Sequence, residues 1–398
     1  MMAMRPRHWA GALALALWAL AGMAGAQPVK VGVIGPFSGP SSDFGTPMLQ
    51  GIQLAVEQFN AVGGYLGRPV ELVVKDDQGS PDTGRQRSQE LAREGVVAAL
   101  GFCNTGVAMK SLDVFQQAKL PLIVPCATGT PVTRTYPAAQ SFIFRTSAPD
   151  NIQAPFVVED ILRRGWTRVA LFADDTGYGQ AGRKDVEAAL AAHQLTPVYA
   201  TNFPLGVKSL APQLQAARDA GAQVIFSYTV GPENAVIAQG RKELGWKVPQ
   251  VGGWTLSFPF FIQGGKDAAE GALTAQTFIA EPSNERRASF LSAYARAFKG
   301  RPAVPMAAAQ GYDAAYLLMY ALLGIRDGQV NGPALKHSLE NLQRVYYGVV
   351  ATYERPFSAE EKEAITPNML VMGKVQAGAV TFAYPEDAKR NLLVQRKR

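Results

Sequence analysis

The sequence is poor in the side chains that most often carry catalysis or bind metals. Its 398 residues include three histidines and two cysteines, and His193 and His337 each stand alone in a helical pattern. A zinc site needs several His, Cys or carboxylate ligands at close spacing, and no such pairs occur. The Gly-x-Ser-x-Gly nucleophile motif is also missing. We therefore expect no metal, no cofactor and no enzymatic activity.

The sequence also has little that would bind a nucleotide or a nucleic acid. The glycines of GVIGPFSG (32–39) do not have the Gly-x-Gly-x-x-Gly spacing, and Pro36 interrupts them. The formal net charge is +7, but the basic residues are scattered except near the C-terminus, at 389–390 and 396–398. A short basic end is typical of a solvated tail, so we expect no nucleic-acid partner.

Long hydrophobic runs are confined to the first 26 residues. Arg5 and Arg7 precede an apolar run over 9–23, and Ala24-Gly25-Ala26 gives the small-x-small pattern of a signal peptidase site. The run is shorter than the roughly 20 residues that span a bilayer, which argues against an anchor. We predict a signal peptide at 1–26, cleaved after Ala26, and a periplasmic protein.

In an oxidising compartment, the two cysteines have two possible states. Cys103 and Cys126 could form a disulfide, or they could be two small buried thiols. The sequence leaves both alternatives open.

From Val29 onward, short apolar runs alternate with helical patterns. Strand–helix–strand alternation with short connections predicts parallel sheets covered by helices on both faces. The alternation occurs twice in succession, which indicates two similar α/β lobes. The predicted strands are 29–37, 70–77, 96–102, 120–127, 168–175, 196–203, 222–229 and 248–254.

Two hydroxyl-rich loops follow neighbouring predicted strands. These are CNTG (103–106), which runs into a helix, and CATGTP (126–131). Ligands of open parallel sheets collect at the carboxyl ends of the strands, and helix N-termini there have free N–H groups. With the hydroxyls of Thr105 and Thr128, these groups predict a carboxylate site, although Ser and Thr could simply cap helices.

Nine segments follow one another along the chain after the leader: VKVGVIGPFSGPSSDFG, GIQLAVEQFNAVGG, DDQGSPDTGRQRSQEL, GFCNTGVA, LPLIVPCATGTPVT, FIFRTSAPD, ADDTGYGQ, GYDAAYLLMYAL and YYGVVATYERPFSAEE. In their order and spacing, the sequence resembles the periplasmic substrate-binding proteins of branched-chain amino acid ABC transporters, the leucine/isoleucine/valine-binding family with the type I periplasmic binding fold. The resemblance covers nearly all of the chain after the leader.

The resemblance implies two doubly wound, Rossmann-like lobes joined by a three-segment hinge. The N-lobe would hold 27–147 and 277–350, and the C-lobe 148–276 and 351–398. It also implies a monomer that closes on its ligand and delivers it to an inner-membrane ABC permease.

The resemblance further implies which residues touch the ligand. The Thr105 hydroxyl, the backbone at Cys126, and the hydroxyl and N–H of Thr128 would hold a carboxylate, while Phe44 and Tyr178 would close over the ligand from opposite lobes. Where the amino acid receptors have an acid for the α-ammonium, this chain has Trp254 in VGGWTLSF. An unpaired buried ammonium costs several kcal/mol, so this change selects against zwitterions.

The expected function is therefore a receptor for a small carboxylate, an aromatic or branched organic acid. Asp174, Asp175 or Glu233 could replace the missing acid, which would make the ligand a branched-chain or aromatic amino acid, and Trp254 could instead be a core residue. Further alternatives are an amide or urea sensor and a periplasmic hydrolase. A DNA-binding repressor of the same fold is disfavoured by the leader.

Overall fold

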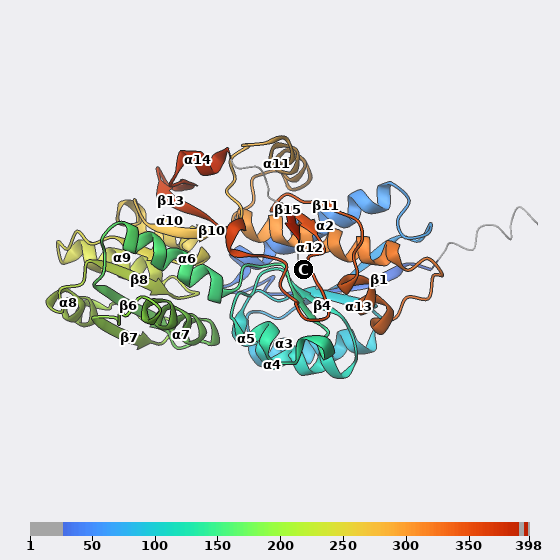
Figure 1. Cartoon of the computed structure of the whole chain (residues 1–398), viewed down its shortest axis with the longest axis horizontal. Helices are drawn as coiled ribbons and strands as arrows, with labels where there is room; N and C mark the ends of the chain where they lie inside the picture. The colour runs from blue at the N-terminus through green and yellow to red at the C-terminus, as the bar shows by residue number, and fades with distance from the viewer. Residues whose placement is uncertain (1–26, 390–393, 397–398) are drawn as a thin grey trace, which may run out of the picture.

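The computed structural model describes residues 27–389 and 394–396 and has two α/β lobes (Figure 1). The predicted leader and its cleavage site lie outside the described residues. The predicted class, two doubly wound lobes, is confirmed: one sheet has the strand order β2-β1-β3-β4-β5 and a second the order β14-β13-β10-β9-β8-β6-β7.

The first sheet is entirely parallel. Its strands and the helices that alternate with them are β1 (Val29–Gly35), α2 (Ser42–Ala61), β2 (Val70–Asp76), α3 (Pro81–Arg93), β3 (Ala98–Gly101), α4 (Thr105–Gln117), β4 (Leu122–Val124), α5 (Pro131–Arg134), the 3-10 turn η1 (Ala138–Gln140) and β5 (Ile143–Arg145).

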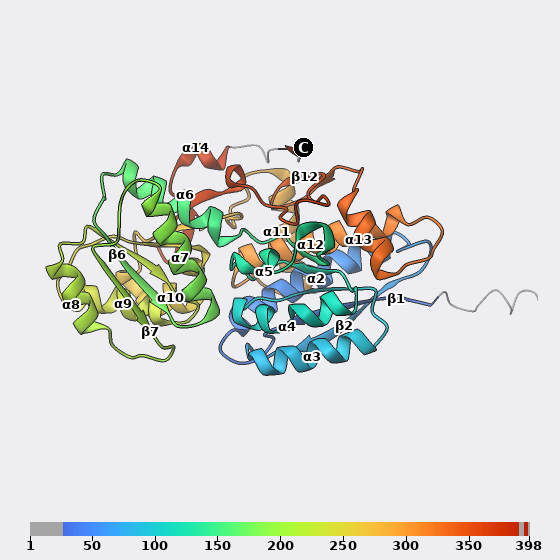
Figure 2. The same cartoon turned by 60° about the horizontal axis from the view of Figure 1, so that its bottom comes forward.

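Three later helices join this lobe: α11 (Glu285–Phe298), α12 (Pro305–Gly324) and α13 (Gly332–Glu340). Helix α12 crosses α2 closely because glycines meet at the crossing: a Cβ on Gly51 would lie 2.0 Å from the Ala308 carbonyl oxygen, and one on Gly311 2.4 Å from that of Met48. Val31 and Val33 pack with α2 and α12, while Ile34 and Ala99 pack with α3 and α4. Helices therefore cover both faces of the sheet (Figure 2).

The second sheet has five parallel strands and an antiparallel pair at one edge. Its elements in chain order are α6 (Asp150–Arg163), β6 (Val169–Asp174), α7 (Gly177–Ala191), β7 (Tyr199–Phe203), α8 (Ala211–Asp219), β8 (Val224–Tyr228), α9 (Glu233–Glu243), β9 (Gln250–Gly252), η2 (Trp254–Ser257), α10 (Pro259–Gly265), η3 (Lys266–Ala268), β10 (Leu273–Gln276), η4 (Pro367–Met369), β13 (Val371–Gln376), β14 (Ala379–Phe382) and α14 (Pro385–Ala388).

Strand β6 shows why this sheet is covered on both sides. Its alternate residues point to opposite faces: Val169 and Leu171 pack in the core with α6 and α7, whereas Ala170 and Phe172 pack with α8 and α9. All six residues of the strand are buried. A continuous apolar run is thus the expected pattern for a doubly covered parallel strand.

The segment between α13 and β13 also packs on the first lobe. Strands β11 (Tyr346–Tyr347), β12 (Thr352–Glu354) and β15 (Val394–Arg396) form a small third sheet. Phe357 packs edge-on against Phe144 with ring centroids 5.0 Å apart. The Arg145 N–H donates to the Lys362 carbonyl at 2.8 Å. Within 27–389 and 394–396, no helix is both long and apolar enough to cross a membrane.

Candidate functional site

The carboxyl edge of the first sheet presents an uncapped helix N-terminus. Helix α4 begins at Thr105, and the side chain of its N-cap residue, Asn104, makes no capping hydrogen bond. The Thr105 hydroxyl oxygen accepts from the Gly129 N–H at 3.1 Å, which ties together the loops after β3 and β4. The first turn of α4 therefore keeps N–H groups available for an anion.

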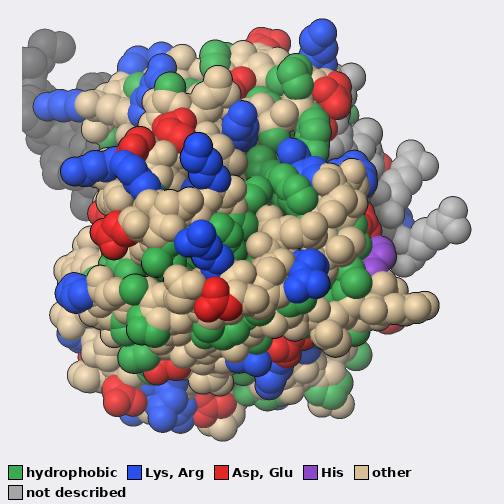
Figure 3. All heavy atoms as spheres, turned by 90° about the vertical axis from the view of Figure 1, so that its left-hand side faces the viewer, with side chains coloured by type: hydrophobic (Ala, Val, Ile, Leu, Met, Phe, Trp, Pro, Cys, Tyr) green, Lys and Arg blue, Asp and Glu red, His purple; other side chains and the backbone are tan. Residues whose placement is uncertain are grey.

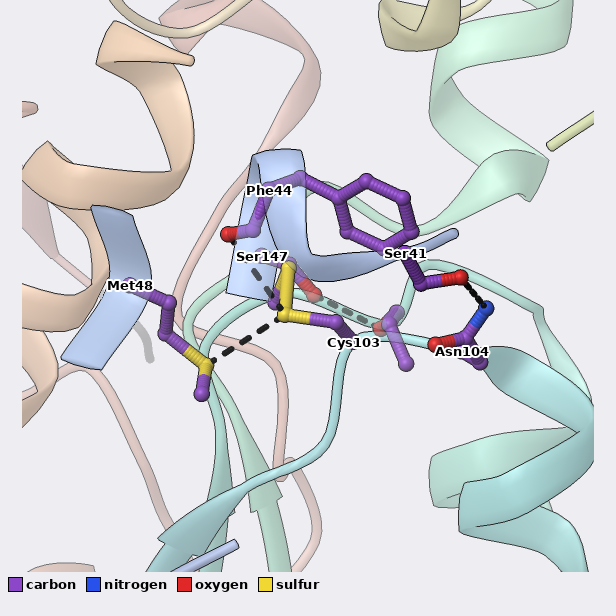
Figure 4. Close-up of a disulfide and its surroundings, with 8 residues drawn as sticks. Ser41, Phe44, Met48, Cys103, Asn104 and Ser147 are labelled. Carbon is purple, nitrogen blue, oxygen red and sulfur yellow. Dashed lines mark hydrogen bonds between the residues drawn. A yellow bond between two sulfur atoms is a disulfide. The ribbon is translucent and has the colours of Figure 1, made fainter. Parts of the chain in front are cut away.

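A disulfide joins the same two loops. Cys103 and Cys126 are bonded, with their Cα atoms 4.5 Å apart, so the structure resolves the alternative that the sequence left open. Cys103 Sγ lies 4.0 Å from the Phe44 carbonyl oxygen and 3.5 Å from Met48 Sδ (Figure 4). The bridge thus fixes Cys126 against the segment of α2 that carries Phe44.

The loop after β4 is held against the N-terminus of α6. The carbonyl of Thr128 accepts from the Asp150 N–H and from Arg145 Nη1, both at 2.9 Å. The Thr128 hydroxyl and Asp150 Oδ2 are buried and have no hydrogen-bond partner among the described residues. Thr128 therefore has a fixed backbone and an unused side-chain hydroxyl.

Asp150 is completely buried, and this changes its acidity. Burial raises the pKa of its carboxyl to about 7, although the neighbouring Tyr228 and Thr128 hydroxyls act to lower it. Neither hydroxyl reaches it with ordinary hydrogen-bond geometry. An acid of this kind, buried with one free oxygen, is typical of a binding site.

Two tyrosines of the second lobe face this acid. Tyr178 is in the first turn of α7 and Tyr228 ends β8, and their rings lie 4.8 Å apart. Both hydroxyls border Gly253, where a Cβ would come within 3.3 Å of Tyr178 OH and 3.4 Å of Tyr228 OH. Burial and the nearby Asp150 raise the pKa of both tyrosines well above the usual value. Their hydroxyls are therefore neutral, and neither has a partner in the described part of the chain.

Trp254 connects these tyrosines to the first lobe. Its backbone N–H donates to Gln153 Oε1 at 3.0 Å, and its ring packs edge-on against Phe258, with centroids 4.7 Å apart. The Trp254 ring also lies 6.3 Å from that of Phe44. The side chain is 2% exposed, yet its indole Nε1 has no partner in the described residues. Trp254 is thus a buried aromatic residue with an unused donor.

The structure brings the six predicted site residues into one region. In the first lobe, the disulfide and the two connected loops hold four of them together: Phe44, Thr105, Cys126 and Thr128. Trp254 packs against Phe44 from the second lobe. Tyr178 lies beside Tyr228 and Gly253, which precedes Trp254.

Of the three acids considered from the sequence, two are engaged in hydrogen bonds and one is exposed. Asp174 accepts from Thr176 and from the Val230 N–H, Glu233 accepts from the Gly206 N–H at 2.6 Å, and Asp175 is exposed. Asp150 is the acid that the sequence reasoning missed. Its position just after FRTSAP, at the carboxyl end of β5, could have identified it by the rule that selected Thr105 and Thr128.

The lobes touch beside these residues. The Thr130 hydroxyl donates to Asp185 Oδ2 at 2.7 Å, from the first lobe to α7. A Cβ on Gly177 would lie 3.1 Å from the Cα of Gly106, so the N-terminal ends of α4 and α7 almost meet. The described residues include no group of three or more His, Cys, Asp or Glu side chains placed to hold a metal ion.

Comparison with known proteins gives a consistent result. A profile described as periplasmic binding protein matches residues 28–379. The Leu/Ile/Val-binding protein homolog 3 of Brucella melitensis is 28% identical over 246 residues, which are 62% of this chain and just under two thirds (66%) of that relative.

Solved structures share the fold. The leucine-binding protein LivK of Thermotoga maritima superimposes with a TM-score of 0.79 at 23% identity, over 90% of this chain and 99% of that one. A solute-binding protein of an ABC transporter from R. palustris, in complex with benzoate, gives a TM-score of 0.76 at 18% identity, over 89% and 95% of the two chains.

Proposed function

Since this chain belongs to the periplasmic binding protein family, we propose that it is the substrate-binding receptor of an ABC importer. It captures a small carboxylate with an aromatic or branched apolar body between its lobes, acts in the periplasm as a monomer, and delivers the ligand to an inner-membrane permease. It binds and releases its ligand without chemical change.

One observation carries the proposal: five buried polar atoms from both lobes lack partners within the described residues. They are Thr128 Oγ1, Asp150 Oδ2, Tyr178 OH, Tyr228 OH and Trp254 Nε1. More than about 90% of buried polar groups in proteins are hydrogen-bonded, and each unsatisfied one costs about 1–3 kcal/mol. A polar ligand that satisfies several of them is the simplest explanation for such a group.

The carboxylate binds at the edge of the first sheet. Its hydrogen-bond donors are the N–H groups of the uncapped first turn of α4, the backbone at Cys126 and the Thr128 hydroxyl, which is unpartnered within the described residues. The hydroxyl of Thr105 accepts from Gly129 but still has its own proton to donate. The positive end of the helix dipole adds to the attraction.

The body of the ligand lies against aromatic rings. Phe44, Trp254 and Phe258 form one group, with Phe44 and Phe258 stacked at 4.8 Å, and Tyr178 and Tyr228 form another. Flat or branched apolar groups pack well against such rings. Phe44 comes from the first lobe and the other four rings from the second, so closure completes the wall.

A second candidate within the same class is an α-amino acid, and Asp150 favours it. In an α-amino acid, the ammonium and the carboxylate are attached to the same carbon. Asp150 lies beside Thr128, so an acid for the ammonium is next to the proposed carboxylate site. The free Oδ2 of Asp150 would pair with the ammonium. Structurally similar proteins are described with both kinds of ligand: LivK is a leucine-binding protein, and the R. palustris protein is in complex with benzoate.

The division into lobes is part of this proposal. We place the first two crossings near residues 147 and 277, as the sequence resemblance implies. The third crossing lies between 365 and 371, later than residue 350, because residues 352–365 contact the first lobe and β13 belongs to the second sheet. Ligand binding closes the lobes about these three segments.

A thermal-shift comparison of matched pairs tests the proposal. Leucine is paired with 4-methylpentanoate and phenylalanine with 3-phenylpropanoate, and benzoate is added. A ligand at about 100 times its Kd stabilises the protein by about 2.7 kcal/mol. Thr128→Ala should weaken binding about ten- to hundredfold, the size of a lost hydrogen bond to a charged group.

A matched control is Thr201→Ala, in β7 at the edge of the second sheet. Shifts with the deaminated acids support the first candidate, and shifts with the amino acids alone support the second. If none of these compounds shifts the transition, or if Thr128→Ala binds as tightly as the parent, the carboxylate site proposed here is wrong.

A further inference from the structure

The second lobe has a pocket at the end opposite to the candidate site. Its volume is about 770 Å³, and its lining includes Pro249 and Leu273, which stand at the amino ends of β9 and β10. Trp254 lies at the other end of β9, so the length of the sheet separates the two places. Figure 3 views the end of the molecule that carries the second lobe and shows a hollow lined partly by hydrophobic side chains, with Lys and Arg side chains around it.

Positive charge dominates the pocket. Its lining contains five cationic side chains and two acidic ones. Asp267 pairs with Lys242 at 2.6 Å, whereas Glu270 accepts from the N–H groups of Ala377 and Gly378 at 2.9 Å each and keeps its charge. Lys247 and Lys374 have no side-chain partner in the described residues. The pocket therefore has uncompensated positive charge.

A third cation lies deeper. Arg241 donates to the carbonyl oxygens of Val248 and Ala268, which leaves its charge without an acid, and its Nε is buried with no partner in the described part of the chain. A guanidinium held by neutral carbonyls keeps its full attraction for an anion.

Aromatic rings form the other part of the lining. Trp166, Trp246 and Tyr384 border the pocket. The guanidinium of Arg164 lies over Trp166 at 5.4 Å and over Tyr384 at 5.7 Å, and it is fixed by hydrogen bonds of 2.8 Å to Asp160 and to Tyr384 OH. Both tryptophans are partly exposed and line the pocket, so part of each indole is accessible to an aromatic ligand.

We propose that this pocket binds a small planar aromatic anion, an arylcarboxylate or arylsulfonate. The ring stacks on Trp166 and Trp246, and the anionic group faces Lys247, Lys374 and Arg241. The volume lies in the range of about 300–1,000 Å³ that is typical of small-molecule sites, which favours a single compact ligand over an extended acidic peptide. The site is independent of the one between the lobes.

The tryptophans allow a direct test. In residues 27–398 they are Trp166, Trp246 and Trp254, so Trp254→Phe leaves the two pocket tryptophans as reporters. Adding Thr128→Ala weakens the site between the lobes. The fluorescence quenching then reports on the pocket whether or not the proposed receptor function is correct. The probe is 4-nitrobenzenesulfonate, whose nitroaromatic ring quenches tryptophan fluorescence, and its neutral match is 4-nitrobenzenesulfonamide.

We expect saturable quenching by the sulfonate, with the sulfonamide at least about tenfold weaker. Lys247→Gln together with Lys374→Gln should weaken the sulfonate about five- to twentyfold, the combined effect of two exposed charge contacts. The control variant, Lys30→Gln with Lys208→Gln, makes the same change in net charge at exposed positions outside the pocket and should bind as the parent does.

Three results would overturn the proposal. One is quenching that does not saturate, or that is equally strong in the Lys247/Lys374 variant and in the Lys30/Lys208 control. The second is equal binding of the sulfonamide, which would reduce the pocket to a nonspecific apolar surface. The third is displacement of the sulfonate by micromolar tetraglutamate, which would assign the pocket to an acidic peptide.

Discussion

Asp150 should make ligand affinity depend on pH, and the sign of the dependence identifies the ligand class. Its carboxyl has a pKa of about 7, raised chiefly by burial, in the structure without ligand. A ligand that places an ammonium beside it lowers this pKa, whereas a ligand that brings only a carboxylate raises it. Binding of the first kind releases protons, and binding of the second kind takes them up.

The magnitude follows from linkage. An amino acid should bind more tightly as the pH rises from about 5 to 7, by up to tenfold per pH unit, and should reach a plateau above 7. A simple carboxylate should bind with constant affinity below pH 7 and lose up to tenfold per unit above it. Tyr178 and Tyr228, whose pKa values lie well above 10, do not titrate in this window.

Isothermal titration calorimetry from pH 5 to 8.5 measures this directly, in two buffers of different ionisation enthalpy to count protons. Asp150→Asn removes the titrating group, so either dependence should disappear. The same substitution should weaken binding of an amino acid about ten- to hundredfold but strengthen binding of a simple carboxylate above pH 7.

Asp185 serves as the matched control, because burial raises its pKa as well and it lies near enough to affect Asp150. Asp185→Asn should shift the midpoint slightly and keep the slope. A pH profile that is the same in Asp150→Asn and in the parent would refute the role of Asp150.

Two further predictions concern the frame of the site. Arg145→Met should lower the free energy of unfolding in urea by about 3–5 kcal/mol, because Glu363 would remain buried without its partner. Adding Glu363→Gln should recover part of this loss. If the losses of the two single variants add up instead, the two residues are not a coupled pair. Replacing Cys103 and Cys126 with alanine opens a loop closed over a sequence separation of 23 and should cost about 3 kcal/mol. An unfolding free energy unchanged within about 1 kcal/mol would show that the bridge adds nothing.

The sequence by itself determined the fold class and predicted most of the candidate site residues. Alternating apolar runs and helical patterns suffice for parallel sheets, because a strand buried on both faces must be apolar along its length, as β6 is. Thr105 and Thr128 could be found because each follows a strand, and the carboxyl ends of parallel strands meet at one edge. Phe44, Cys126, Tyr178 and Trp254 rested on family resemblance.

The tertiary structure decided what depends on pairing between distant segments. The disulfide exists because β3 and β4 are neighbours in the sheet, which brings Cys103 to Cys126. Glu363 reaches Arg145 across more than half of the chain, and β13 joins the second sheet only after residues 352–365 have packed on the first lobe. Local periodicity contains no information on such contacts. Burial is equally nonlocal: Asp150 looks like an ordinary acid at a helix start, and only the packing of both lobes around it raises its pKa and leaves one oxygen without a partner in the described residues.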